Sequence, residues 1–188
     1  IENFMKTPLI ILLLIPFIGV AQFQNKKTYN ITRTNSVPNI DGNLNDNTWK
    51  SLDIAKNFTQ LEPNNGMKER SHQRTEVKIC YDDRNIYFGV MMYDNAPDSI
   101  LTELSKRDED NKNFDGFGVW INPFNDGQIE YNFFITAAGV QIDRKFSSTG
   151  TDPRWDAVWK SAVNINEDGW IAEFSIPFSS LRFSNDGN

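Results

Sequence analysis

The amino-acid sequence predicts an all-β protein, an antiparallel β-sandwich of about nine short strands. Period-two patterns of apolar and polar residues dominate the chain after residue 21, as they do in strands that bury one face. Turn signals rich in Gly, Asn and Asp separate these runs. No apolar stripe of helical period and useful length follows residue 21. Aromatic residues make up 13% of the chain, and many lie in the alternating runs, which indicates that they fill a β core.

The first part of the chain predicts short elements around a single helical turn. A strand is expected over residues 28–34, and Asp41-Gly42 predicts a turn. Asp46 is expected to cap a helical turn that points Trp49 inward. A short strand over residues 58–61 then precedes a loop rich in Asn, Gly and charge.

The clearest hairpin joins residues 75–81 to residues 86–93 through the turn Asp82-Asp83-Arg84-Asn85. Its first strand alternates between apolar and polar residues. Its second strand is apolar on both faces, which is typical of a strand buried on both sides of its sheet. Residues 99–105 predict a further strand, and residues 106–113 predict a charged loop.

The second half of the chain predicts strands that return on one another. They cover residues 117–121, 130–136 and 140–146, followed by a hairpin of residues 160–165 and 170–176. Pro177 ends the last strand. The alternation places four apolar residues on one face of that strand: Trp170, Ala172, Phe174 and Ile176.

Residues 1–21 predict a leader and signal peptide that is not part of the fold. Lys6 precedes an apolar run over residues 9–20, and Gly19-Val20-Ala21 has the small residues that precede signal-peptidase cleavage. An N-terminal membrane anchor is the alternative, although the run is short for a membrane-spanning helix. We therefore expect export to the periplasm, the outer membrane or the extracellular space. The remaining chain is expected to divide into a lead-in over residues 22–36, one sandwich domain over residues 37–183, and the start of a following region over residues 184–188.

Composition argues against several classes of function. The net charge of −6 and the pI of about 4.8 argue against nucleic-acid binding, which requires a basic surface. Cys80 is the only cysteine, so no intrachain disulfide can form. His72 is the only histidine, which removes most zinc sites and histidine-based catalytic triads. No motif of a nucleophile elbow, phosphate loop or zinc protease is present, and no catalytic residue is predicted for this domain.

Several motifs, in the same order along the chain, resemble the family 9 carbohydrate-binding modules. They are residues 37–42 with Asp46 and Trp49, residues 81–90 followed by Tyr93-Asp94, residues 114–122 led by Asp115, and the Gly-aromatic-x-x-Glu-x-x-Ile hairpin of residues 169–177. The resemblance covers residues 37–183. It implies a carbohydrate-binding-module-like jelly roll that binds a polysaccharide or oligosaccharide. In many relatives the module accompanies a glycoside hydrolase, and some contain structural calcium.

A bacterial subgroup of secreted or outer-membrane proteins is similar to the chain in further stretches. These are Arg107-Asp108, Trp155-Asp156-x-x-Trp159 and residues 176–183. Members of the subgroup carry such a module before a long β-rich region, so a C-terminal region of the same protein is an expected partner. The resemblance implies non-catalytic polysaccharide binding linked to carbohydrate catabolism, with hydrolysis or transport supplied elsewhere in the protein.

The family's sugar clamp transfers poorly to this sequence. Relatives hold the sugar between two tryptophans with help from charged side chains, and two of the clamp positions here are Lys112 and Gly118. Trp159 is expected in the core, whereas Trp155 lies in a loop and is a candidate stacking platform. The predicted ligand-binding residues are Trp155, Arg154, Arg107, Asp108, Asp115 and Trp120.

Simpler alternatives stay open for these residues and for the whole domain. The 106–113 stretch also fits a solvated loop, and the Asp115 carboxylate also fits a role in tying down loop amides. Calcium candidates are Asp82, Asp83 and Asp94, although no EF-hand-type loop is present. The alternative function is a structural interaction domain that packs on a C-terminal β-rich region after loss of the sugar site. A haem-binding sandwich would need His72 with Met91 or Met92 as axial ligands.

Overall fold

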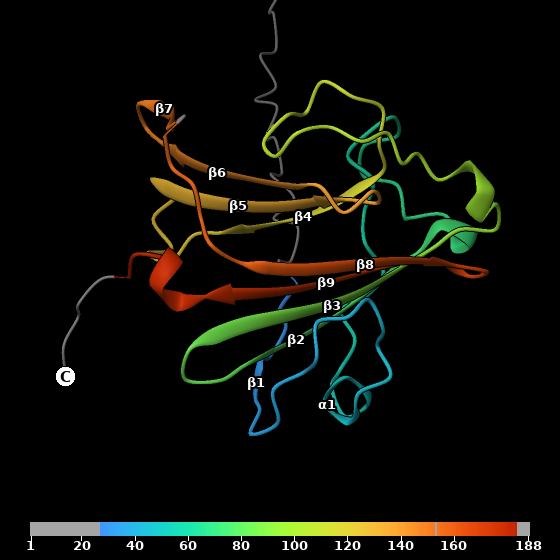
Figure 1. Cartoon of the computed structure of the whole chain (residues 1–188), viewed down its shortest axis with the longest axis horizontal. Helices are drawn as coiled ribbons and strands as arrows, with labels where there is room; N and C mark the ends of the chain where they lie inside the picture. The colour runs from blue at the N-terminus through green and yellow to red at the C-terminus, as the bar shows by residue number, and fades with distance from the viewer. Residues whose placement is uncertain (1–26, 153, 184–188) are drawn as a thin grey trace, which may run out of the picture.

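The computed structural model describes residues 27–152 and 154–183. Two sheets stack face to face, which confirms the predicted β-sandwich (Figure 1). The expected leader, residues 1–21, and the expected start of a following region, residues 184–188, lie outside the described residues. Within the described ranges, no helix has the length and apolar character needed to cross a membrane.

The strands divide into sheets of five and four. The five-stranded sheet has the order β1 (Thr32–Arg33), β2 (Thr75–Tyr81), β3 (Asn85–Tyr93), β9 (Gly169–Pro177), β8 (Lys160–Asn166). The four-stranded sheet has the order β4 (Gly116–Ile121), β5 (Ile129–Thr136), β6 (Gln141–Ser147), β7 (Gly150–Asp152). All pairings are antiparallel except that of β1 with β2. The helical elements are α1 (Asn47–Lys50) and the 3-10 turns η1 (Ser71–Gln73), η2 (Pro97–Ser99) and η3 (Phe178–Ser180).

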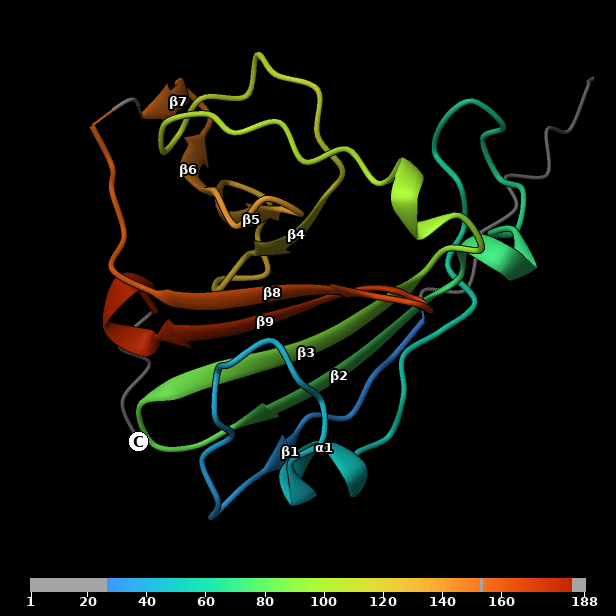
Figure 2. The same ribbon diagram turned by 45° about the vertical axis from the view of Figure 1, so that its right-hand side comes forward.

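The main core fills the space between the two layers that Figure 2 shows edge-on. Phe174 of β9 stacks on Trp159, with ring centroids 5.3 Å apart and ring planes 8° apart. Phe133 of β5 meets Trp159 edge to face at 5.6 Å. Each aromatic side chain removes roughly 150–250 Å² from water, so these three rings supply much of the burial that joins the sheets.

A second cluster covers the outer face of the five-stranded sheet, on the side where Figure 1 shows α1. Trp49 of α1 is fully buried and lies over Gly89 of β3, where a Cβ atom would come within 3.0 Å of the indole. The carboxylate of Glu173 in β9 accepts hydrogen bonds from Trp49 Nε1 at 2.8 Å and from the amides of Asp41 and Gly42 at 2.9 and 2.6 Å. One buried acid therefore fixes the N-terminal segment to the sheet.

The central strands match their sequence predictions. β3 lies between β2 and β9 and has buried residues on both faces, including Tyr87 and Phe88. This confirms the prediction for residues 86–93. The predicted apolar face of β9 also lies in the main core, through Trp170, Ala172, Phe174 and Ile176.

Some predicted elements at the edges were wrong. Residues 58–61 and 99–105 form only single bridges, Thr59 to Lys68 and Thr102 to Phe114, because no neighbouring strand extends their pairing. The strand predicted over residues 28–34 shortens to Thr32–Arg33, and the three-residue strand β7 was not predicted. Asp46 stands at the N-cap of α1 but does not cap it, since its carboxylate instead accepts the amide of Asn39 at 2.7 Å.

Candidate functional site

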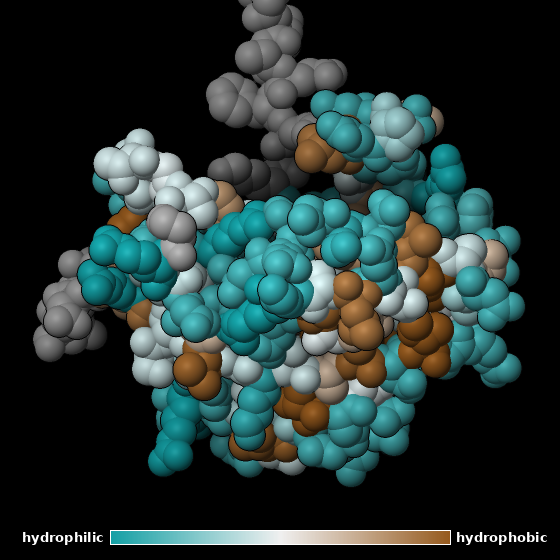
Figure 3. Space-filling view, turned by 45° about the horizontal axis from the view of Figure 1, so that its top comes forward, coloured by the Kyte–Doolittle hydropathy of each residue, from teal (hydrophilic) through white to brown (hydrophobic). Residues whose placement is uncertain are grey.

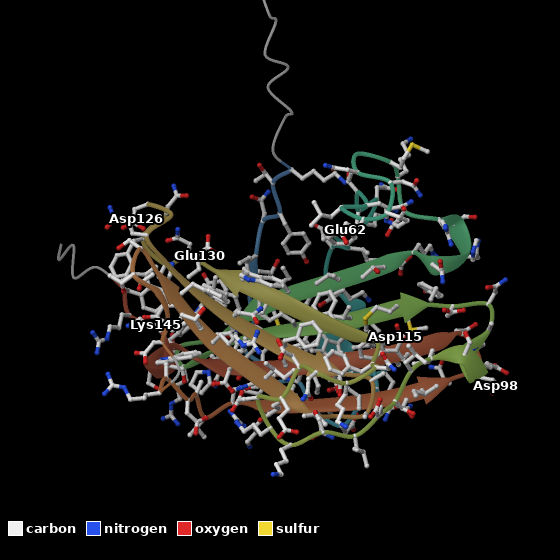
Figure 4. The ribbon with its side chains drawn as sticks, turned by 90° about the horizontal axis from the view of Figure 1, so that it is seen from above. Glu62, Asp98, Asp115, Asp126, Glu130 and Lys145 are labelled. Atoms are coloured by element: carbon white, nitrogen blue, oxygen red, sulfur yellow. The ribbon has the colours of Figure 1, made fainter. Side chains whose placement is uncertain are left out.

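The predicted ligand-binding residues lie in separate settings. Arg107 and Asp108 hold a loop against the start of β6, whereas Trp155 borders a pocket at one end of the sandwich. Trp120 lies on the outer face of β4. Figure 4 shows Asp115 and Lys145, a residue of the pocket lining, at opposite ends of the molecule. The predicted residues therefore do not form a single site.

Arg107 belongs to a network centred on the buried carboxylate of Asp143. Its guanidinium forms an ion pair with Asp143 and donates to the carbonyl oxygen of Ala157 at 2.7 Å. Asp143 also accepts the amide of Ala157 at 2.7 Å and Trp159 Nε1 at 3.0 Å. Burial raises the pKa of Asp143, while the indole, the amide and the guanidinium favour its charged form. The network fixes Trp159 in the core and ties the 101–114 loop to residues 156–159.

Asp108 completes the same junction from the backbone side. β7 pairs only with Lys145, Phe146 and Ser147, so the start of β6 has an open edge. The Asp108 amide donates to the carbonyl oxygen of Gln141 at 3.1 Å, and its carboxylate accepts the amide of Asp143 at 2.9 Å. Asp108 thereby takes the place of a missing edge strand, which keeps that edge from pairing with another chain.

The geometry gives Arg107 and Asp108 a structural role, and the sequence prediction missed their partner, Asp143. In β6 the inward positions are Gln141, Asp143 and Lys145, so the usual apolar alternation is inverted. This inverted alternation was the sequence signal from which the role of Asp143 could have been found. It marks a strand whose inner face needs polar partners at the end of the core.

Trp155 lines a pocket of about 360 Å³ at the end of the sandwich, which we call the Trp155 pocket. Its indole is half-buried and packs against Tyr131 at 5.1 Å and edge to face against Phe133 at 5.7 Å. Arg154 is largely exposed, and its backbone amide donates to the carboxylate of Asp152 at 3.0 Å. The pocket lining comprises Tyr131, Lys145, Trp155, Asp156, Ala157, Val158, Ser179, Ser180 and Arg182.

Trp120 forms a platform on the outer face of the four-stranded sheet. It is 59% exposed, and its indole lies over Gly118, where a Cβ atom would come within 3.2 Å of the ring. Asn132 of β5 is its cross-strand neighbour, and Arg144 of β6 is the next residue in the same row. Arg144 is held by Asp110 of the 101–114 loop at 2.7 Å.

Asp115 ties down a loop. Its carboxylate accepts the amide of Leu101 at 2.9 Å, and its own amide donates to the carbonyl oxygen of Leu101 at the same distance. This geometry matches the alternative considered for Asp115 from the sequence, in which the carboxylate holds loop amides.

The calcium candidates do not fit a metal site. Asp82 accepts the amides of Arg84 and Asn85, each at 2.7 Å, and Asp83 pairs with Arg33 at 2.5 Å. Asp94 lies beyond the other end of β3 and accepts the amide of Ala96 at 2.7 Å. Throughout the described ranges, no group of three or more His, Cys, Asp or Glu side chains could hold a metal ion.

Comparisons with known proteins agree with the observed sandwich. Two solved structures are family 9 carbohydrate-binding modules from Caldicellulosiruptor kristjanssonii, one in complex with glucose and one in complex with cellotriose. The first is 16% identical with a TM-score of 0.54 and covers 79% of this chain and 68% of its own. The second is 14% identical with a TM-score of 0.52 and covers 78% of this chain and 66% of its own. At these identities the likeness shows a shared fold.

The family assignment rests on a match over most of the chain. No curated protein matches the chain. The family model described as Carbohydrate family 9 binding domain-like matches residues 40–188. The chain therefore belongs to the carbohydrate family 9 binding domain-like family.

Proposed function

We propose that the chain is a non-catalytic saccharide-binding module whose ligand stacks on Trp120. One observation carries the proposal: among the five tryptophans, only Trp120 is largely exposed, at 59%. Trp49, Trp159 and Trp170 are buried, and Trp155 is half-buried. A flat aromatic face held open on a sheet suits the C–H face of a sugar ring, while its polar edge and neighbours suit the hydroxyl groups.

On the outer face of each sheet a tryptophan lies over a glycine, but only one of the two tryptophans is buried. On the five-stranded sheet Trp49 lies over Gly89 and is buried beneath the N-terminal segment. On the four-stranded sheet Trp120 lies over Gly118 but keeps more than half of its surface open to solvent. We therefore expect a ligand to cover Trp120, as the chain itself covers Trp49.

The changed clamp positions are compatible with a platform at Trp120. Gly118, at one clamp position, leaves the space that the indole of Trp120 occupies. Lys112, at the other, pairs with Glu103 at 3.3 Å. Sugar stacking on Trp120 would therefore replace the two-tryptophan clamp of relatives with a single open platform.

Polar groups border the platform on the side of the 101–114 loop. The Asp110–Arg144 ion pair supplies both donors and acceptors, and Arg144 is fixed by that pair before any ligand binds. Figure 3 shows the molecule tilted toward this side, where the surface is largely hydrophilic with separate apolar patches. These features support a ligand rich in hydroxyl groups.

The wider setting is also part of the proposal. The pattern of residues 1–21 supports export to the periplasm, the outer membrane or the extracellular space. Resemblance to the secreted and outer-membrane subgroup supports a role in carbohydrate catabolism, with hydrolysis or transport by another region. Because the similar modules are in complex with glucose and cellotriose, neutral glucans are the first ligands to test.

Native affinity electrophoresis tests the proposal on the purified chain. Gels that contain soluble glucans should retard the wild-type chain, and Trp120→Ala should weaken the retardation at least tenfold, about 1.4 kcal/mol in binding free energy. Phe58→Ala removes another exposed aromatic residue, 39% exposed, and should leave the retardation unchanged.

Two different results would contradict the proposal. A Trp120→Ala chain that is retarded as strongly as wild type would exclude the platform as the site. Absence of retardation on every glucan and other glycan gel would favour the structural interaction domain instead.

A further inference from the structure

We infer that the Trp155 pocket is a second saccharide site and that it binds a sugar unit bearing a carboxylate, such as a uronic acid. The inference rests on the proposed saccharide binding for the nature of the ligand, but it concerns different residues. Tyr131 of β5 and Lys145 of β6 are cross-strand neighbours whose side chains point toward the core. The adjacent cross-strand row, which points outward, consists of Trp120, Asn132 and Arg144. The two sites thus lie on opposite faces of the same sheet.

The pocket is a concave site with a fixed aromatic wall. Its volume of about 360 Å³ lies at the lower end of the range of ligand pockets, roughly 300–1,000 Å³. Contacts with Tyr131 and Phe133 hold the indole of Trp155 in place from the core side. A wall fixed in advance loses little side-chain entropy when a sugar ring packs against it.

Two cations in the lining have no acidic partner in the part of the chain that the structure describes. Neither Lys145 nor Arg182 has a carboxylate oxygen within 4.0 Å there. They reach the pocket from different elements, since Lys145 belongs to β6 and Arg182 follows η3. The fold therefore brings two positive charges from different elements to the same pocket.

Two acids lie near the pocket, and each has a contact of its own. Asp156 lines the pocket and lies 3.1 Å from Arg107. Asp152 of β7 stands opposite Lys145, but its carboxylate accepts the amide of Arg154 at 3.0 Å and lies 4.0 Å from Arg154 Nε. A ligand carboxylate would thus meet Lys145 and Arg182, neither of which pairs with an acid among the described residues.

The remaining lining groups suit the rest of a sugar. Ser179 and Ser180 offer hydroxyl groups that can donate and accept, and Trp155 offers an apolar face. A carboxylate placed between an ammonium and a guanidinium group forms charge-assisted hydrogen bonds, which are about twice as strong as neutral ones. Charge then selects the acidic sugar over its neutral counterpart.

Isothermal titration of the purified chain tests this with trigalacturonate and its methyl ester. We expect the acid to bind at least tenfold more tightly than the ester, with an affinity that falls as salt rises. Lys145→Met and Arg182→Met should each weaken binding of the acid about tenfold and change binding of the ester little. Trp155→Ala should weaken both ligands, and Lys160→Met, an exposed lysine outside this pocket, should change neither.

Several results would overturn the inference. These are equal affinity for acid and ester, unchanged affinity in both cation variants, competition by acetate at the concentration of the sugar acid, or no binding of trigalacturonate. Trp120→Ala separates this inference from the proposed function, because it should weaken retardation on neutral glucans at least tenfold while leaving the binding of trigalacturonate intact. Loss of trigalacturonate binding in Trp120→Ala would assign the acid to the outer face and overturn the inference.

Discussion

Removing the Glu173 carboxylate should strongly destabilise the sandwich. This buried side chain is the only described acceptor for Trp49 Nε1, and it also accepts the amides of Asp41 and Gly42. Glu173→Ala leaves the indole and the Gly42 amide without an acceptor in a buried setting, whereas the exposed Asp41 amide can bind water. The segment that carries α1 then loses its polar attachment to β9.

The structure sets the size of the effect. Each buried donor left unpaired costs about 1–3 kcal/mol, so the two donors together lose about 2–6 kcal/mol. Burial removes water from the charged Glu173 carboxylate, which raises its pKa. Removing the carboxylate therefore also removes this desolvation cost, which offsets part of the loss. We therefore expect the free energy of unfolding to fall by about 2–4 kcal/mol, a large share of the roughly 5–15 kcal/mol of a typical domain.

Urea unfolding followed by tryptophan fluorescence measures this loss. Glu167→Ala, an exposed acid in the turn between β8 and β9, is the control and should change stability by less than about 0.5 kcal/mol. Glu173→Gln keeps the volume and one acceptor oxygen, so it should lose about 1–3 kcal/mol and stay folded. A loss below about 1 kcal/mol in Glu173→Ala would refute the reasoning.

The pH dependence gives a second readout of Glu173. Because its pKa is raised in the folded chain, the native state holds this proton more tightly than the unfolded state does. Its contribution to stability therefore falls as pH rises from the ordinary value of 4.5 through the raised pKa. Glu173→Gln should lack this part of the slope, and an identical slope in both chains would contradict the assignment.

Two further predictions concern other buried groups. Burial raises the pKa of the Cys80 thiol to about 11. Iodoacetamide at pH 8 should therefore leave the native chain unmodified while it alkylates the unfolded chain. Rapid alkylation of the native chain would contradict this prediction. Arg107→Met leaves Asp143 without its cation and should lower the free energy of unfolding by about 1–3 kcal/mol in urea, discounted for the partial exposure of Arg107. Arg154→Met is its largely exposed control, and equal stability of the two variants would count against the Asp143 network.

The sequence predicted the centre of the sandwich because burial there follows strand periodicity. Trp170, Ala172, Phe174 and Ile176 alternate with residues of the opposite face, and the structure places all four in the main core. Trp159 was expected in the core and is 6% exposed. Large aromatic residues in such runs have few alternatives to burial, so local pattern is enough.

The edges could not be predicted in the same way. Residues 58–61 and 99–105 contain apolar residues, yet Leu61 is 75% exposed and Leu104 is 72% exposed. Whether such a segment becomes a strand depends on a neighbour that continues its hydrogen-bonded ladder, and each of these segments has only a single bridge. β7 shows the converse, because the short Gly150–Asp152 segment pairs with β6 without a strong strand pattern of its own.

The candidate sites depend on contacts between distant parts of the chain. Arg107 pairs with Asp143, which is 36 residues away in the sequence, and no local sequence pattern indicates that the two side chains meet. The Trp155 pocket likewise needs β6, the loop before β8 and the segment after η3 to meet at one end. By contrast, the outward position of Trp120 follows from its alternation with Val119 and Ile121, which pack toward the core. Its outward position could be predicted, whereas the lack of a covering segment among residues 27–152 and 154–183 could not.

The central claim, that a saccharide stacks on Trp120, is tested most directly by the tryptophan indole N–H signals in a two-dimensional NMR titration with cellotriose. The five tryptophans give five signals, and Trp120→Ala assigns the relevant one. We predict that the Trp120 signal shifts most, while those of Trp49 and Trp159, which donate to Glu173 and Asp143, stay in place. A Trp120 signal that does not move while binding is detected by another method, or a set of signals that never moves with any saccharide, would contradict the account.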